Sequence, residues 1–375
     1  MCRHIRGSNQ MRIVAIVQLI GDKVTNFNSI RSIGDQPGQV KVGFPVIALE
    51  EHLIVPDQED YLGPSYALDQ KRDLLLDYGD QRLADMDAGG IDVAVLSAFS
   101  DGVQGIDMTD SDLGDDAEPR VTAQVDFAIK WNNQLRDIVA SQPERYRGFA
   151  ALPMASPADA ADELRRCVQD LGFVGALING EDTASDGSPN FYIDRSYDVL
   201  WATCVELNRP IYLHPRMKAT PDPFYEVDNC EVLRTSPWGF HENIARLGMA
   251  LTVNGVFSRF PDLKVILGHM GELLPFWAWR IDHRLRLEGR PELAMMQEVL
   301  AQNIYVTISG FNSTPAFRHV LEVMGTDRVL CASDYPMEDP IAMRDWLDEA
   351  TTAVGLNASD IEAIRHGNAK ALLGI

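Results

Sequence analysis

Acidic and imidazole side chains that could hold a divalent metal ion stand where hydrophobic stretches of the chain end. The first stretch ends in Glu50-Glu51-His52, a later one in His214 and the last in Asp334. Mixed nitrogen and oxygen ligands suit zinc, manganese or iron(II), so ligand type alone does not choose the metal. Each histidine taken singly is more often a hydrogen-bonded core residue than a ligand. Their shared position at strand ends predicts a metal site of Glu50, His52, His214 and Asp334.

The spacing of the first group determines which side chains act together. Successive side chains of a strand point to opposite faces, so Glu50 and His52 share a face that Glu51 does not. If that face points into a barrel, the two residues converge at the carboxyl end of the strands. Barrel active sites are built at that end.

A second candidate group follows in Gly268-His269-Met270-Gly271-Glu272. The flanking glycines predict a turn from strand to helix that lets a substrate approach the backbone. Glu272 could accept the second ring N–H of His269 and so set its tautomer and basicity. The alternative is that Glu272 is simply a favourable acid in the first turn of a helix.

The possible roles of other polar residues in the helical stretches are less specific. Arg280 could clamp a carboxylate or orient a metal ligand, and the alternative is an ion pair with Asp282 or Asp339. The remaining helical histidines are interpreted as surface or packing residues; they are His241, His283, His319 and His366.

Eight short hydrophobic runs must position these groups. The runs are continuous rather than alternating, as expected for strands of a parallel sheet covered by helices. The predicted strands are Val46–His52, Val93–Ala98, Tyr146–Pro153, Phe173–Asn179, Pro210–Pro215, Lys264–Met270, Ile304–Ser309 and Arg328–Asp334.

Amphipathic stretches of helical length alternate with the runs. They are Asp126–Ser141, Ala158–Leu171, Arg195–Leu207, His241–Phe260 (interrupted at Asn254-Gly255), Glu272–Leu287, Thr314–Met324, Ile341–Val354 and Ser359–Leu373, with Ser359 as an expected N-cap. The order predicts an α/β fold, a (β/α)8 TIM barrel, with an open doubly wound sheet as the alternative. No glycine-rich phosphate loop follows any strand, which disfavours the open sheet.

The chain is expected to form one catalytic domain over residues 45–375. Residues 1–44 contribute none of the chemistry and are expected to be a poorly ordered N-terminal extension. Long connections over residues 53–78 and 99–122 are expected to lie above the catalytic end. The second holds five aspartates without EF-hand spacing, so a solvated loop is expected; they are Asp107, Asp110, Asp112, Asp115 and Asp116.

Composition excludes several classes of partner. The net charge of −22 argues against nucleic acid and against anionic membranes, both of which require basic surface. No apolar run approaches the length of a membrane span. The five cysteines are scattered without a CxxC spacing, which indicates neither a disulfide framework nor a thiolate zinc site and favours a cytoplasmic location.

The motifs at the strand ends resemble those of a known family. The motifs are Ile47-Ala48-Leu49-Glu50-Glu51-His52, Tyr212-Leu213-His214-Pro215-Arg216, Ile266-Leu267-Gly268-His269-Met270-Gly271-Glu272 and Ala332-Ser333-Asp334-Tyr335-Pro336. Together they are similar to the amidohydrolase-related decarboxylases of aromatic acids, whose members include γ-resorcylate and 2,3-dihydroxybenzoate decarboxylases. The similarity runs from about Val46 to the C-terminus. Its most specific part is Glu-Glu-His, where related hydrolases usually begin with His-x-His.

The resemblance implies roles for these residues and for the protein. Glu50, His52, His214 and Asp334 would bind one divalent ion, Mn²⁺ or Zn²⁺, with no organic cofactor. The expected fourth strand contains no lysine, and a binuclear barrel hydrolase would need a carbamylated lysine there, so one ion is expected. His269 and Glu272 would form a catalytic pair.

The family's reaction is non-oxidative decarboxylation of a small aromatic carboxylic acid of the hydroxybenzoate type. Asp334 would protonate the ring carbon before carbon dioxide leaves, and Arg280 would support the substrate pocket. A homodimer or homotetramer is expected. Met337 stands where the resemblance predicts Phe after Asp-Trp-Pro, which changes a wall of the pocket.

Three alternatives remain at this point. A hydrolase on the same barrel would open a lactone or ring-cleavage product with metal-bound water, and a hydratase would act on a similar product. The non-enzymatic alternative is an acidic binding or scaffold protein on a vestigial barrel.

Overall fold

The computed structural model describes residues 43–56, 58, 66–105, 117–183, 188–217 and 222–375. Phe44–Ile375 forms one compact unit. Residues 1–42 of the expected N-terminal extension and the five aspartates of the second long connection lie outside the described residues, so both interpretations stay predictions.

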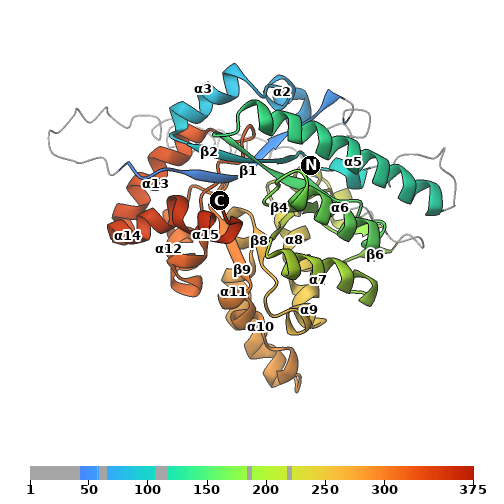
Figure 1. The fold of residues 1–375 in the computed structure, drawn as a ribbon. Coiled ribbons are helices and arrows are strands. Elements are labelled where there is room, and N and C mark those ends of the chain that lie inside the picture. Colours follow the sequence, from blue (N-terminus) through green and yellow to red (C-terminus); the bar gives the residue numbers. More distant parts are fainter. Residues whose placement is uncertain (1–42, 57, 59–65, 106–116, 184–187, 218–221) are drawn as a thin grey trace, which may run out of the picture. The chain divides into compact units, whose positions relative to one another are not determined.

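Eight parallel strands form one sheet in strict chain order (Figure 1). The strands are β1 (Ile47–Leu53), β2 (Val93–Ala98), β3 (Tyr146–Ala151), β4 (Gly175–Asn179), β7 (Ile211–His214), β8 (Val265–Leu267), β9 (Ile304–Thr307) and β10 (Val329–Leu330). Leu49 N donates to Cys331 O at 3.1 Å, and His52 N donates to Tyr335 O at 2.7 Å. These bonds join the first strand to the chain after the last, so the predicted (β/α)8 barrel and all eight predicted strands are confirmed.

The helices cover the outside of the barrel and largely follow the predicted stretches (Figure 1). They are α2 (Tyr66–Leu75), α3 (Asp80–Gly89), α5 (Ala117–Ser141), α6 (Pro157–Gln169), α7 (Asp198–Leu207), α8 (Gly239–Val253), α9 (Val256–Arg259), α10 (Leu274–Leu287), α11 (Met296–Gln302), α12 (Thr314–Met324), α13 (Pro340–Val354), α14 (Ala358–Glu362) and α15 (Asn368–Leu373). None of them is both long and apolar enough to cross a membrane.

Three helices and a hairpin were not predicted, and one cap was placed wrongly. α2 lies inside the connection over residues 53–78, α3 precedes β2, and α11 lies between α10 and β9. The small β5–β6 hairpin (Asp182–Thr183 with Pro189–Asn190) follows β4. Asn357, not Ser359, caps α14, because its side chain accepts from Asp360 N while Asp360 reaches back to the Asn357 backbone.

A β-bulge in β1 decides which of its side chains enter the barrel. The pairing of β1 with β2 shifts between Ala48 and Glu51. Leu49 packs with Tyr212 in the apolar cluster inside the barrel, yet Glu50, the next residue, also meets Tyr212 through its carboxylate. Without the extra residue of a bulge, two consecutive side chains could not face inward. The bulge therefore replaces an apolar interior with a polar one at the carboxyl end of the strand.

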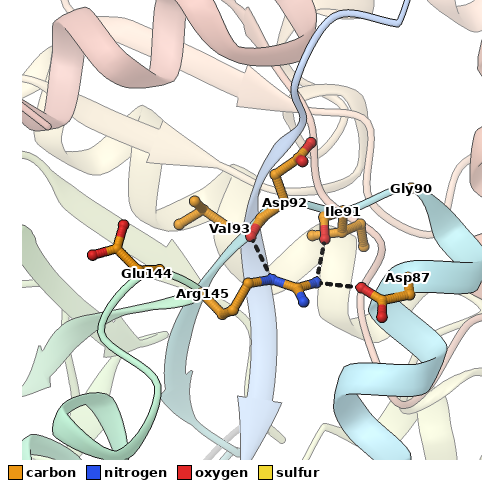
Figure 2. Close-up of a pocket in the computed structure, with 7 residues that line it drawn as sticks. All are labelled: Asp87, Gly90, Ile91, Asp92, Val93, Glu144 and Arg145. Carbon is orange, nitrogen blue, oxygen red and sulfur yellow. Dashed lines mark hydrogen bonds and ion pairs between the residues drawn. The ribbon is translucent and has the colours of Figure 1, made fainter.

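A hollow of about 400 Å³ opens at the opposite, amino-terminal end of β2 and β3 (Figure 2). Arg145 crosses it, donating to the Asp87 carboxylate and to the backbone oxygens of Ile91 and Asp92 at 2.8–2.9 Å. These bonds occupy the guanidinium, so Arg145 links the turn between α3 and β2 to the start of β3. Barrel chemistry belongs to the other end.

Candidate active site

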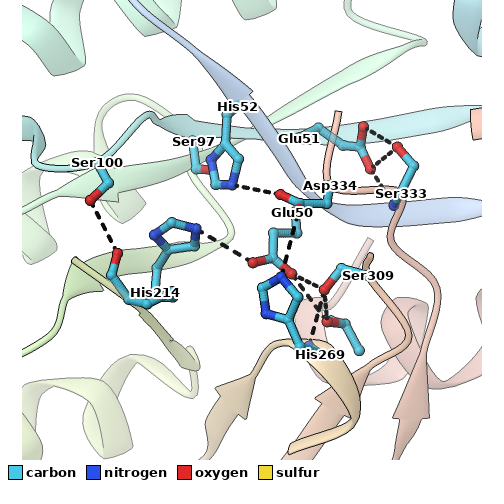
Figure 3. A network of polar contacts seen from close by, with 12 residues as sticks. Glu50, Glu51, His52, Ser97, Ser100, His214, His269, Ser309, Ser333 and Asp334 are labelled. Carbon is cyan, nitrogen blue, oxygen red and sulfur yellow. Dashed lines mark hydrogen bonds and ion pairs between the residues drawn. The ribbon is translucent and has the colours of Figure 1, made fainter. Parts of the chain in front are cut away.

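Four predicted ligands converge where β1, β7 and β10 end at the carboxyl end of the barrel (Figure 3). One ligand atom from each of Glu50, His52 and His214 lies within 4.8 Å of the others. Asp334 completes the group, with Oδ1 3.5 Å from His52 Nε2. His214 Nε2 lies 3.5 Å from Glu50 Oε1. These separations are too long for good hydrogen bonds, and they leave room for an ion between the atoms.

Two atoms in this cluster are buried without a hydrogen-bond partner. They are Glu50 Oε1 and His52 Nε2. An unsatisfied buried carboxylate oxygen costs several kcal/mol in an apolar surrounding, so such orphans are rare. A cation between Glu50, His52, His214 and Asp334 would satisfy both. The residues present therefore fit a divalent metal ion.

The second ring nitrogen of each histidine is already engaged. His52 Nδ1 lies 3.2 Å from Ser97 Oγ, and His214 Nδ1 lies 3.1 Å from Asn179 Oδ1. Since Asn179 Oδ1 can only accept, Nδ1 of His214 carries the proton and Nε2 has the free lone pair. Burial, and then the neighbouring His52, lower the pKa of His214 well below its ordinary value. A neutral imidazole aimed inward is what a metal ligand requires.

Glu50 is oriented by hydroxyl groups that the sequence did not reveal. Tyr212, Thr307 and Ser309 all donate to its Oε2, which turns Oε1 toward His214. Burial raises the pKa of Glu50, and His269 opposes that rise. A bound cation would favour the ionised form. Alternation along β7 and β9 could have placed Tyr212 and Thr307 inside the barrel, but not against Glu50.

Glu51 points away from the cluster, as the strand alternation predicts (Figure 3). Its carboxylate accepts from Ser333 N and Ser333 Oγ at 2.8–2.9 Å. Burial raises its pKa to about 7, although the Ser333 hydrogen bonds and Arg82 lower it in part. In the folded protein, Glu51 is therefore largely protonated and neutral below pH 7.

This shift predicts a pH-dependent difference in stability between the wild type and Glu51→Gln. The folded pKa of Glu51 exceeds the unfolded value, so the folded state binds the extra proton between pH 4.5 and 7. Its contribution is present at low pH and is lost as the pH rises through that window. We expect the wild type to lose about 2 kcal/mol relative to Glu51→Gln between pH 5 and 7.5. Denaturant midpoints at both pH values measure it, and parallel curves would contradict it.

His269 and Glu272 form the expected contact. His269 Nδ1 lies 2.7 Å from Glu272 Oε1, and its Nε2 lies 3.4 Å from Asp334 Oδ2. Burial opposes the charged form of His269, but Glu272 and Glu50 together raise its pKa well above the ordinary value. Glu272 precedes α10, which begins at Leu274, so it is not an acid of the first helical turn. The catalytic role of the pair stays a prediction.

The interpretation of His241 as a surface or packing residue was wrong. His241 Nδ1 lies 2.5 Å from Glu272 Oε2, on the far side of the carboxylate from His269. His241, His269 and Glu272 could geometrically hold a metal. Both oxygens of Glu272 are already bonded to imidazole nitrogens, however, whereas the orphaned atoms belong to the Glu50 cluster. The ion site is therefore better assigned to that cluster.

The backbone around these groups adopts conformations that most residues avoid. His269, Met270, Glu272, Leu273 and Asp334 all have φ between 45° and 71°. Such left-handed conformations cost free energy in non-glycine residues and cluster at functional sites. Here they turn the chain sharply enough to direct His269, Glu272 and Asp334 toward one another.

Two glycines keep space open around the carboxylates. A Cβ on Gly268 would lie 3.1 Å from both carboxylate oxygens of Glu50. A Cβ on Gly310, which has φ +56°, would lie 3.2 Å from Asp334 Oδ2 and 3.3 Å from His269 Cδ2. A side chain at either position would therefore crowd the Glu50 carboxylate or the Asp334–His269 pair.

Arg280 is not brought into this cluster. Its side chain is exposed on α10, and no hydrogen bond or ion pair of Arg280 is found among the described residues. Asp282 instead accepts from Met296 N and Gln297, and Asp339 caps α13, so neither is its partner. Substrate binding by Arg280 stays a prediction.

Residues 75–375 match the model of the amidohydrolase family described as "Amidohydrolase". The chain belongs to this family. A γ-resorcylate decarboxylase of Rhodococcus jostii is 37% identical over 317 residues, 81% of this chain and 92% of that protein. A protein of the same name from Rhizobium sp. is 36% identical over 82% of this chain and 92% of its own length.

Solved structures agree with these relatives. A 2,6-dihydroxybenzoate decarboxylase complexed with 2,6-dihydroxybenzoate is similar with a TM-score of 0.78, 33% identity and coverage of 88% of this chain and 100% of that one. A dihydroxybenzoic acid decarboxylase from Polaromonas sp., with bound manganese and 2-nitroresorcinol, has a TM-score of 0.78, 35% identity and coverage of 88% and 97%.

Proposed function

We propose that the protein is a metal-dependent carboxy-lyase that decarboxylates a hydroxybenzoate-type aromatic acid without oxidation. The main observation behind this proposal is the position of Asp334. Its Oδ1 lies 3.5 Å from His52 Nε2 in the metal cluster, and its Oδ2 lies 3.4 Å from His269 Nε2. The named activities of the similar proteins support the same reaction. 2,6-Dihydroxybenzoate is the first substrate to test.

Glu50, His52, His214 and Asp334 would hold one divalent ion. Manganese is the first candidate because a similar structure contains it, and zinc is the second. Bound there, the ion would supply positive charge that stabilises the anionic substrate in the site. We propose no organic cofactor, because the protonated ring itself accepts the electron pair of the broken carbon–carbon bond.

The protein's own residues would manage the proton. The ring carbon bearing the carboxylate accepts a proton, the carbon–carbon bond breaks, and its electron pair restores the aromatic ring as carbon dioxide leaves. Burial favours protonated Asp334, but the neighbouring His269 and His52 imidazoles lower its pKa. His269 holds the proton at rest, with Nε2 3.4 Å from Asp334 Oδ2. We infer that Asp334 delivers this proton to the ring as general acid.

Product analysis separates this reaction from a hydrolase or hydratase on the same barrel. We expect the manganese-loaded protein, given a panel of hydroxybenzoates, to release one carbon dioxide per phenol formed. Incorporation of water without carbon dioxide would instead establish the hydrolase or hydratase. The same panel shows which ring substituents are accepted.

We further propose that the protein is cytoplasmic and acts as a homodimer or homotetramer without nucleic acid or membrane partners. The resemblance to the family supports the assembly, and the net charge of −22 supports the absence of anionic partners. Native mass spectrometry of the metal-loaded protein measures the subunit number, and a monomer would contradict the assembly.

A further inference from the structure

His241, near the start of α8, contacts the candidate active site without being part of the chemistry proposed above. Its Nδ1 lies 2.5 Å from Glu272 Oε2, while His269 Nδ1 lies 2.7 Å from Oε1 of the same carboxylate. The two imidazole rings meet edge to face, with centroids 5.4 Å apart and an interplanar angle of 79°. One carboxylate is thus held between two histidines from different elements.

The charge of Glu272 fixes the direction of both hydrogen bonds. Its side chain is fully buried, and burial alone would raise its pKa. His269, and then the hydrogen bond from His241, lower that pKa to about 2. An ionised carboxylate can only accept, so both imidazoles donate from Nδ1.

Glu272 needs a support outside its own segment. It lies in the left-handed region, at φ 50°, between a short turn and the start of α10. If Oε2 lost its donor, a buried anionic oxygen would be unsatisfied, and the carboxylate would turn to share the remaining N–H of His269. His241 supplies the donor from α8, and its position leaves Oε1 directed at His269.

We propose that His241 is a positioning residue, which holds Glu272 and thereby fixes the ring of His269 opposite Asp334. This inference rests on the proposed decarboxylation, in which His269 and Asp334 share the proton delivered to the ring. His241 itself contacts none of the four candidate metal ligands by any hydrogen bond found in the described residues. Its effect should therefore appear in turnover rather than in metal content.

The test compares two substitutions of His241 that should preserve the fold but differ in whether they can donate a hydrogen bond to Glu272. His241→Phe keeps an aromatic ring and removes the donor, whereas His241→Asn places an amide N–H at the position of Nδ1. We expect His241→Phe to lower kcat at least tenfold with KM and manganese content within about threefold of the wild type. His241→Asn should stay within about threefold in kcat. His283→Phe, on α10 against Trp279, is the control for loss of a histidine.

A spectroscopic measurement keeps the test independent of the reaction. The His269 Nδ1–H proton, identified by its loss in His269→Gln, should give a downfield NMR resonance that moves in His241→Phe and not in His241→Asn. If that pattern appears in a protein without decarboxylase activity, the positioning is right and the proposed function is wrong. An unmoved resonance with wild-type kcat in His241→Phe overturns the positioning. Equal losses in both variants would also overturn it, because packing alone would then explain them.

Discussion

Asp334→Asn is expected to lose roughly a thousandfold in turnover while the barrel stays folded. The amide keeps the shape of the side chain and an oxygen for the metal, but it cannot deliver a proton to the ring carbon. His269, 3.4 Å away, would keep its proton without a group to pass it on. Carbon dioxide release by the manganese-loaded variant measures the loss, and circular dichroism checks the fold.

The matched comparison for this variant is binding of a substrate analogue. Because the amide oxygen can still bind the metal, the affinity of Asp334→Asn for a nitro-substituted resorcinol should stay within about tenfold of the wild type. A variant with near-wild-type turnover would remove Asp334 from the role of acid. Loss of analogue binding and of manganese together would assign Asp334 to metal binding alone.

Glu50→Gln is expected to reduce manganese from one ion per chain to a small fraction and to abolish turnover. The substitution leaves the hydroxyl donors Tyr212 and Ser309 against a neutral amide, and it removes the negative charge that offsets the ion. Elemental analysis after gel filtration measures the metal, and excess manganese should restore little activity.

The adjacent residue supplies a close control. Glu51→Gln makes the same chemical change one position along β1, but its side chain faces Ser333 outside the cluster. It should bind one manganese ion per chain and retain turnover. Equal metal loss in both variants would contradict the assignment of Glu50, because a general disturbance of β1 would then account for both.

The sequence predicted the barrel and its strand ends because both depend on local patterns. Buried runs mark the strands, and the two-residue spacing of Glu50 and His52 fixes their shared face whatever happens elsewhere. The bulge that directs this face inward could not be predicted, because it depends on pairing with β2. α2 was missed because residues 53–78 were interpreted as one long connection.

Around His269 and Glu272, too, some contacts could be predicted from the sequence and others could not. The short spacing from His269 to Glu272 made their hydrogen bond predictable. His241 lies 31 residues from Glu272 in an ordinary helical stretch, so only the packing of α8 against the turn before α10 reveals it. Tyr212 and Ser309 were missed for the same reason, since hydroxyl groups from separate strands carry no local signal.

The most direct test of metal-dependent decarboxylation is a manganese titration of the metal-depleted protein with 2,6-dihydroxybenzoate in D₂O. We expect carbon dioxide release to rise with manganese and to saturate at one ion per chain. Each resorcinol formed should carry one deuterium at the carbon that lost the carboxylate. Full activity without metal, or product formed with no carbon dioxide, would contradict a metal-dependent decarboxylase.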